Sequence, residues 1–272
     1  GIGMASSTLF GAFLIGAACD VGRKRKSNQD ALAVLLPEDG VPIPPLLVIS
    51  DGMGGHNGGE TASRLVIEAF REEFTQFQPP LDATQALQHC AQKAHEAIRA
   101  RAADDPSLKG MGSTVVATFL SNDRVDVINV GDSRAYLLRG QEITQISADQ
   151  SWVMDQVRAG KLTLEQARRH RKRNHLSMSL NANRPTIMPI LKSETFEQDD
   201  ILLLCSDGLW GVVPESFIWA ASNEFEPQEA VDKLVTLANQ SGGRDNISVI
   251  IARRQDRESV KTMQDDVTGA GE

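Results

Sequence analysis

The sequence predicts an α+β protein in which antiparallel strands and helices form separate layers. Strand-like segments are grouped between residues 113 and 146, and their connecting turns are too short for parallel pairing, which needs a crossover of about a dozen residues. Two long segments with apolar residues at helical spacing are grouped between residues 60 and 98. Such grouping of strands and of helices is typical of layered α+β domains.

The N-terminal part of the chain predicts three strands. Residues 9–18 and 31–36 are apolar runs separated by a polar loop rich in Arg and Lys. The third run, residues 46–50, has four consecutive apolar residues, which indicates a strand buried on both faces. It stops at Asp51, where the glycine pairs of residues 51–55 predict a tight, exposed loop.

The remaining elements follow from periodicity and capping residues. One helix is predicted over residues 60–77, and a second is predicted after Asp82 as its cap, with an apolar stripe over residues 87–98. Both stripes are interpreted as core rather than as a cofactor site. Further strands are expected at residues 113–120, 124–130, 134–138, 142–146, 187–193, 201–205 and 247–252. Further helices are expected at residues 151–158, 163–169, 215–221 and 228–239.

Composition excludes several classes of protein. The chain has 272 residues, 41% of them hydrophobic, and a formal net charge of −8, which argues against nucleic acid as a partner. No apolar run approaches the roughly 20 residues that span a bilayer, so no membrane partner is expected. Cys19, Cys90 and Cys205 lack metal or disulfide spacing, which is typical of a reducing cytoplasm.

Four aspartates stand at the ends of predicted strands. Asp51 and Asp207 each follow an apolar run and a serine, Asp132 follows a third run, and Asp245 precedes a fourth. A single Asp-Gly pair is usually only a turn, but four carboxylates at one sheet edge would repel each other unless a cation compensated them. Oxygen ligands alone favour magnesium or manganese over zinc.

Six short motifs occur in one order along the chain. They are Arg25-x-x-Asn28-Gln29-Asp30, Asp51-Gly52-Met53-Gly54-Gly55-His56, Gly112-Ser113-Thr114, Gly131-Asp132-Ser133-Arg134, Ser206-Asp207-Gly208 and Asp245-Asn246. Each is weak alone, but together they resemble the bacterial branch of the metal-dependent protein phosphatases of type 2C, the PPM family. The resemblance runs from about residue 16 to residue 252.

The resemblance implies a four-layer α-β-β-α sandwich: two antiparallel sheets packed face to face, with helices outside both. Residues 1–272 would form a single phosphatase domain with its core at about 8–255. A flap is expected at about 148–183, where the sequence departs from the family pattern, and a disordered tail at about 257–272.

The resemblance also implies a centre of two Mn²⁺ or Mg²⁺ ions. Asp51 would bridge the two ions, the Gly52 carbonyl would bind one of them, and Asp207 and Asp245 would complete the other. Asp132, sharing Asp207, would hold a weaker third ion. Two such ions lower the pKa of a bridging water and supply a hydroxide that attacks the phosphomonoester directly.

The same resemblance assigns the remaining catalytic positions. Arg25 would bind the phosphate through its guanidinium fork, and Asp30 is retained as a catalytic residue. Gln29 stands where the family often has glutamate, which removes a charge close to the metals. Met53 replaces a histidine of animal relatives and cannot donate a proton, so the general acid stays unassigned between a metal-bound water and His56. Cys205 is interpreted as a core residue, because no protein nucleophile is needed.

The basic run at residues 168–173 has two interpretations. It is either a solvated helix end favoured by the helix dipole or a surface that selects acidic or phosphorylated substrates. The solvated helix end is the preferred interpretation, and nucleic-acid binding is not expected because the chain is acidic overall and the run lacks interleaved aromatic residues.

The function implied is that of a cytoplasmic, monomeric bacterial serine/threonine protein phosphatase. Its substrates would be proteins that a partner kinase has phosphorylated. The form of the motif Arg25-x-x-Asn28-Gln29-Asp30 in this chain suggests a link to type VI secretion. One alternative is a weakly active pseudophosphatase that binds phosphoproteins, for which Gln29 is the only indication. Another is a phosphatase of small metabolites, which phosphopeptide and sugar-phosphate turnover would distinguish.

Overall fold

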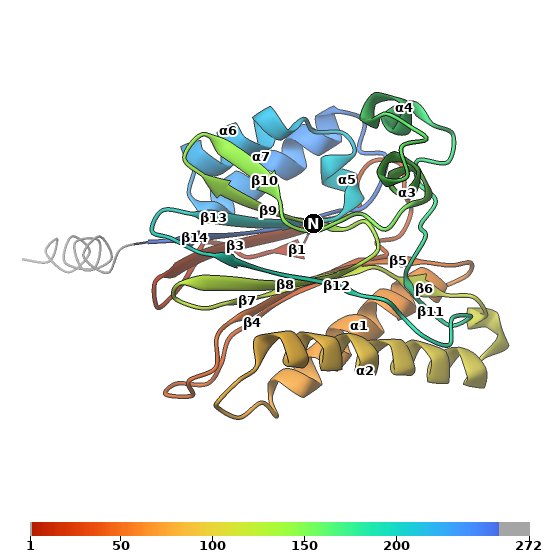
Figure 1. Cartoon of the computed structure of the whole chain (residues 1–272), viewed down its shortest axis with the longest axis horizontal. Helices are drawn as coiled ribbons and strands as arrows, with labels where there is room; N and C mark the ends of the chain where they lie inside the picture. Colours follow the sequence, from red (N-terminus) through yellow and green to blue (C-terminus); the bar gives the residue numbers. More distant parts are fainter. Residues whose placement is uncertain (1, 256–272) are drawn as a thin grey trace, which may run out of the picture.

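Two antiparallel sheets packed face to face form the centre of the computed structural model, which describes residues 2–255 (Figure 1). Helices cover the outer face of each sheet, so the chain folds into four layers in the order α-β-β-α. This confirms the predicted α+β fold. The tail expected at about residues 257–272 lies outside the described residues.

The first sheet has the strand order β1-β3-β14-β13-β9-β10, and β2 pairs with β3. Its strands are β1 (Ile2–Gly3), β2 (Thr8–Phe10), β3 (Phe13–Asp20), β9 (Arg134–Arg139), β10 (Glu142–Gln145), β13 (Ile201–Cys205) and β14 (Ile247–Arg254). Strands from both ends of the chain are therefore neighbours, which brings β14 and its preceding Asp245 beside β3.

The second sheet has the order β11-β6-β5-β7-β8-β12, and β4 pairs with β5. Its strands are β4 (Asp30–Leu35), β5 (Leu46–Met53), β6 (Gly112–Ser113), β7 (Val115–Leu120), β8 (Arg124–Val130), β11 (Leu180–Asn181) and β12 (Ile190–Thr195). Every pairing in both sheets is antiparallel, as the short turns predicted.

The helices fall into three groups. Helices α1 (Gly58–Phe74) and α2 (Ala83–Asp104), followed by the 3₁₀ turn Pro106–Leu108, cover the second sheet. Helices α5 (Asp207–Trp210), α6 (Glu215–Glu224) and α7 (Pro227–Gln240) cover the first. The short helices α3 (Trp152–Arg158) and α4 (Leu164–Arg169) lie beyond one end of the sheets, next to α5 (Figure 1).

Strand β5 is buried on both faces, as its sequence predicts. Leu46 and Val48 pack in the cluster beneath α1 and α2, whereas Leu47 and Ile49 point into the cluster between the sheets. All four side chains are fully buried. The alternation of a strand sends successive side chains to opposite faces, so a continuous apolar run suits a strand between two apolar layers.

Several expected boundaries are wrong. Helix α1 ends at Phe74 rather than at residue 77, and α6 ends at Glu224 rather than at residue 221. Three more errors concern strands. Residues 9–18 are not one strand, because a turn at Gly11, with φ of +57°, folds Leu9 back against Leu14 as a hairpin. Strand β12 begins at Ile190, just after Pro189 and three residues later than predicted. Strand β5 does not stop at Asp51 but continues to Met53, because the short strand β6 pairs with Gly52.

None of the helices within residues 2–255 has the length and apolar character needed to cross a membrane.

Candidate active site

The candidate site lies at the sheet ends nearest α3 and α5, where loops from both sheets meet. Asp30 and Asp51 are directly opposite each other in the β4–β5 pairing. Thr114, at the break between β6 and β7, holds the main chain of Asp51: its Oγ1 accepts from the Asp51 N–H at 3.0 Å, and its own N–H donates to the Asp51 carbonyl at 2.9 Å. These contacts fix the backbone from which the Asp51 carboxylate projects.

The first sheet supplies two serines that hold Asp30 in place. Ser206 Oγ and Ser248 Oγ donate to Asp30 Oδ2 at 2.8 and 2.7 Å, and all three side chains are buried. Ser206 immediately precedes Asp207, the first residue of α5. The hydrogen bonds therefore tie a strand of one sheet to a loop of the other, directly beneath the carboxylates.

The carboxylates of Asp30, Asp51 and Asp207 lie close enough to shift one another's pKa values. Burial, together with the charge of Asp207, raises the pKa of Asp30 to about 7. Burial, with Asp30 and Asp207 adding to it, raises the pKa of Asp51 well above its usual range. Ionised carboxylates in such a cluster therefore require a compensating positive charge.

Asp132 and Asp245 each interact electrostatically with Asp207. Burial and repulsion by Asp207 raise the pKa of Asp132 well above its usual value. The pKa of Asp207 is raised by its burial and then by the charge of Asp245. The structure thus brings together, around Asp207, all five aspartates that the sequence singled out.

The donor set fits a hard divalent cation. Asp207 Oδ1 and Asp30 Oδ1 are buried and have no hydrogen-bond partner within residues 2–255. Unsatisfied buried carboxylate oxygens are costly, and a magnesium or manganese ion would satisfy them. Among residues 2–255, no group of three or more acidic, histidine or cysteine side chains is already arranged to hold a metal ion.

Gly52 is required by the close approach of β5 to α1. Its N–H donates to the Gln29 carbonyl at 2.8 Å, and a Cβ at this position would lie 1.8 Å from the Gly59 carbonyl oxygen. The Gln29 side chain is itself packed against Gly59, where an added Cβ would lie 2.7 Å from the Gln29 amide carbon. The glutamine thus supports the start of α1.

Arg25 lies at the exposed rim of the site. Its Nε is 3.4 Å from Asp245 Oδ1, and 58% of its side chain is exposed. Its charge also lowers the pKa of Asp207, against the larger effect of burial. A cationic fork beside the carboxylates and open to solvent is able to receive the phosphoryl oxygens of a bound phosphate.

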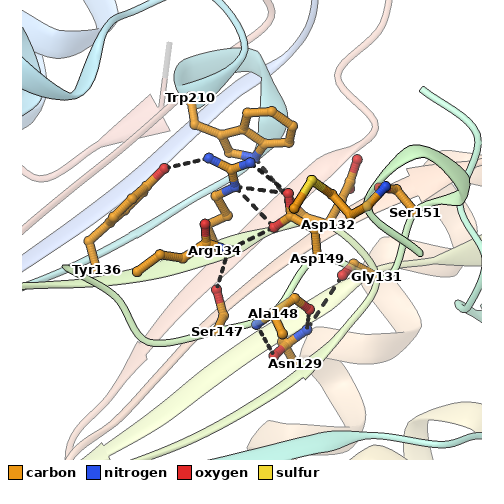
Figure 2. A network of polar contacts seen from close by, with 12 residues as sticks. Asn129, Gly131, Asp132, Arg134, Tyr136, Ser147, Ala148, Asp149, Ser151 and Trp210 are labelled. Carbon is orange, nitrogen blue, oxygen red and sulfur yellow. Dashed lines mark hydrogen bonds and ion pairs between the residues drawn. The ribbon is translucent and has the colours of Figure 1, made fainter. Parts of the chain in front are cut away.

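A buried ion pair supports the Asp132 loop from the side of the flap (Figure 2). Arg134 donates through Nε and Nη2 to Asp149 at 3.0 and 2.6 Å, and through Nη1 to the Tyr136 hydroxyl at 2.8 Å. Its guanidinium lies 3.6 Å from the centre of the Trp210 ring, and the Trp210 indole N–H donates to the Asp132 carbonyl at 2.9 Å. Asp132, α5 and the start of the flap are therefore one connected unit.

Sequence reasoning missed Ser248 and named Ser206, Thr114 and Asn246 only as members of motifs, without a role. Ser206, Ser248 and Thr114 touch the aspartates through hydrogen bonds between elements far apart in the chain, which no local pattern reports. Asn246 was noted only as part of a motif, yet its side chain accepts from the Gln29 N–H and donates to two carbonyls of the loop that carries Arg25.

Comparison with known proteins identifies the family. The model of the family described as protein phosphatase 2C matches residues 22–248. The serine/threonine protein phosphatase PstP of Mycobacterium tuberculosis is 37% identical over 236 residues, which are 87% of this chain but 44% of PstP. The serine/threonine phosphatase stp of Listeria monocytogenes is 33% identical over 239 residues, which cover 86% of this chain and 93% of that protein.

Solved structures agree with the sequence comparison. The catalytic domain of PstP in complex with two manganese ions superposes with a TM-score of 0.79 and 33% identity, over 90% of this chain and 99% of that one. PppA, described as a key regulatory component of the type VI secretion system in Pseudomonas aeruginosa, gives a TM-score of 0.75 and 27% identity, over 89% and 98%. Together with the family match over residues 22–248, these likenesses show that the chain belongs to the protein phosphatase 2C family.

Proposed function

We propose that this chain is a metal-dependent phosphatase that hydrolyses phosphoserine and phosphothreonine in proteins. The observation that carries the proposal is the buried aspartate cluster around Asp207, with an unpartnered carboxylate oxygen, inside the region that matches the family. The chain spans less than half of PstP, so the activity is inferred from the site as well as from the relatives.

We propose the metal ligands from the family resemblance, and the cluster of aspartates around Asp207 supports the choice. Asp51 and the Gly52 carbonyl, with Asp207 and Asp245, would hold two Mn²⁺ or Mg²⁺ ions, and Asp132 with Asp207 a third, weaker one. Bound there, the ions would activate a water for attack on phosphorus and neutralise the phosphoryl charge. The PstP structure with two manganese ions supports this choice of metal.

The chain's own residues then bind and orient the substrate. Arg25, exposed beside Asp245, would receive two phosphoryl oxygens in its guanidinium fork. Asp30 is held by two serine hydroxyls and contacts Asp51, so it would fix the orientation of that carboxylate. No side-chain nucleophile is needed, and Cys205 is fully buried in the core beneath α5.

The cellular setting is proposed from the relatives. Proteins phosphorylated by a bacterial serine/threonine kinase would be the substrates, and the enzyme would act as a cytoplasmic monomer on a single domain of residues 1–272 with a flap at 148–183. The likeness to PppA supports a role in the regulation of type VI secretion.

Hydrolysis of p-nitrophenyl phosphate at millimolar Mn²⁺ tests the proposal. We expect turnover that a chelator abolishes and Mn²⁺ restores, and that is lost in Asp207→Asn. The matched control is Asp104→Asn, the same chemical change at the exposed end of α2, which should keep full activity.

Absence of turnover by the folded chain at millimolar Mn²⁺ would contradict the proposal and favour a phosphoprotein-binding pseudophosphatase. Comparison of a phosphothreonine peptide with a sugar phosphate tests the substrate class. Faster turnover of the sugar phosphate would instead indicate a metabolite phosphatase.

A further inference from the structure

The flap concentrates positive charge that the proposed reaction does not use. The sixteen residues 158–173 hold seven Arg or Lys and one Glu, a formal charge of +6, whereas the whole chain carries −8, so that the remainder carries −14. Such a separation of charge creates a local positive potential on an otherwise acidic molecule.

The run at residues 168–173, here called the basic segment, holds five arginines and lysines, two of which have no partner within residues 2–255. Arg168 and Arg171 are exposed and make no hydrogen bond or ion pair within residues 2–255. Arg169 pairs only with Glu165, at 3.3 Å, and both side chains are at least three-quarters exposed. An exposed pair of this kind contributes little and leaves the arginine free to exchange partners.

The helix dipole explains only part of the basic segment. Helix α4 ends at Arg169, and the dipole acts on charges within the last turn, so Arg168 and Arg169 are the cations it favours. The residues 171–173 lie beyond the helix and have no such stabilisation. A solvated helix end therefore does not account for the charges at residues 171–173, which are half of the basic segment.

Contacts with α3 hold the basic segment in one conformation. The Trp152 ring lies 4.9 Å from the His170 ring, and Lys172 Nζ lies 4.6 Å from the centre of the same tryptophan. The N–H of Lys172 donates to His170 Nδ1 at 3.0 Å, and Arg173 Nη1 donates to the His170 carbonyl at 3.3 Å. A surface already ordered in this way pays less conformational entropy when it binds a partner.

The same part of the flap is joined to the candidate site. Ser151 pairs with Leu176, and Trp152 N–H donates to the His175 carbonyl, so the two ends of the flap are held together. Gln150 exchanges two hydrogen bonds with Gly131, the neighbour of Asp132, at 2.8 and 3.0 Å. Trp210 of α5, the helix that begins at Asp207, lies over Arg134, whose ion-pair partner Asp149 is at the start of the flap (Figure 2).

We propose that the basic segment docks negatively charged peptide segments next to the phosphorylated residue of a protein substrate. The inference rests on the proposed function and narrows its substrates to phosphoproteins with acidic or further phosphorylated residues near the target. Carboxylates and phosphates are the groups that exposed arginines bind, and their attraction would act on the approach of the substrate as well as on its residence.

The test uses peptides with one phosphothreonine core and flanks of three Glu, three Gln or three Lys on each side. A fourth peptide replaces one flanking Glu with phosphoserine, which separates carboxylate from phosphate recognition. We expect kcat/KM for the Glu peptide to exceed that for the Gln peptide by about five- to tenfold at low salt, and the difference to shrink as ionic strength rises.

Two charge-matched variants locate the effect. Arg168→Gln with Arg171→Gln should remove the preference for Glu flanks and leave p-nitrophenyl phosphate turnover unchanged. Arg71→Gln with Arg101→Gln makes the same charge change on α1 and α2, which cover the other sheet, and should keep the preference. Equal use of Glu and Gln peptides by the unmodified chain, or an unaltered preference in the first variant, would overturn the inference.

Binding of fluorescein-labelled peptides, measured by anisotropy, separates this inference from the proposed function. If p-nitrophenyl phosphate is not hydrolysed, the proposed function fails, while the same order of affinities among the peptides still supports docking by the basic segment. Tighter binding of a ten-residue oligothymidylate than of the Glu peptide, lost in Arg168→Gln with Arg171→Gln, would assign the surface to nucleic acid and overturn the inference.

Discussion

Replacement of Asp149 by Asn should destabilise the protein strongly, because it leaves a buried arginine charge without its counter-ion. The Asp149 side chain is 2% exposed and that of Arg134 is 16% exposed, and two guanidinium nitrogens contact the carboxylate. Burial works against the charge on Arg134, but hydrogen bonding to Asp149 keeps its pKa raised, so the guanidinium stays ionised. Removing one partner of a buried pair costs about 3–5 kcal/mol of unfolding free energy.

A second Asp–Arg pair in the same protein provides the control. Asp126 is also buried, with 3% of its side chain exposed, but its partner Arg124 is 53% exposed. In Asp126→Asn the arginine is solvated by water, so we expect a loss of about 1 kcal/mol.

Urea unfolding followed by far-UV circular dichroism measures both losses, and thermal unfolding provides a second estimate. At roughly 2–4 °C per kcal/mol for a protein of this size, a loss of about 3 kcal/mol lowers Tm by about 6–12 °C. The Asp126 variant should lose about 2–4 °C. Equal losses of unfolding free energy in Asp149→Asn and Asp126→Asn would refute the reasoning, because the exposure of the arginine would then not determine how much stability is lost.

Three further predictions concern the site and its surroundings. Gly52→Ala should lower Tm and abolish p-nitrophenyl phosphate turnover, because its Cβ would meet a backbone oxygen of α1 at 1.8 Å, whereas Gly55→Ala, in open space, should be neutral. Arg25→Ala should raise KM for p-nitrophenyl phosphate roughly tenfold or more through loss of the charged contact, with Lys24→Ala close to the unmodified chain; an unchanged KM would contradict the role in phosphate binding. Burial lowers the pKa of His95 below its ordinary value of 6.5. The folded protein therefore favours neutral His95, and this contribution to the unfolding free energy is complete above pH 6.5. It is lost as the pH falls through the lowered pKa, by up to about 1.4 kcal/mol per pH unit. Between pH 7 and 5, the unfolding free energy measured with urea should therefore fall less steeply for His95→Gln than for the unmodified chain. An equally steep fall in both proteins would contradict this prediction.

Much of the fold could be predicted from local patterns. The double-sided burial of β5 follows from four consecutive apolar residues, and the antiparallel pairing of β7 with β8 and of β9 with β10 follows from turns too short for a crossover. The short connection from β8 to β9 instead joins the two sheets. The capping residues Asp82 and Thr163 mark the starts of α2 and α4 correctly, because a cap is a contact between residues three apart.

The predicted strand boundaries were wrong where the backbone conformation of one residue, or pairing with a strand far away in the sequence, determines where a strand begins or ends. The hairpin at Gly11 depends on a positive φ that an apolar run does not reveal. The extension of β5 to Met53 depends on pairing with β6, some sixty residues later in the chain. Periodicity reports which face of an element is apolar, but it does not report which other element supplies its hydrogen bonds.

Some features of the candidate site could likewise be predicted from the sequence, and others could not. The sequence by itself determined the residue types that the chemistry needs, since aspartates at strand ends and a nearby Arg25 are visible as motifs. Only the tertiary structure decided that Asp30, Asp51, Asp132 and Asp245 each lie close enough to Asp207 for their charges to interact, that Ser206 and Ser248 hold Asp30, and that the buried Arg134–Asp149 pair joins the flap to the Asp132 loop. The physical reason is that these contacts join residues up to 218 positions apart, and their energies depend on burial, which exists only once the two sheets have packed together.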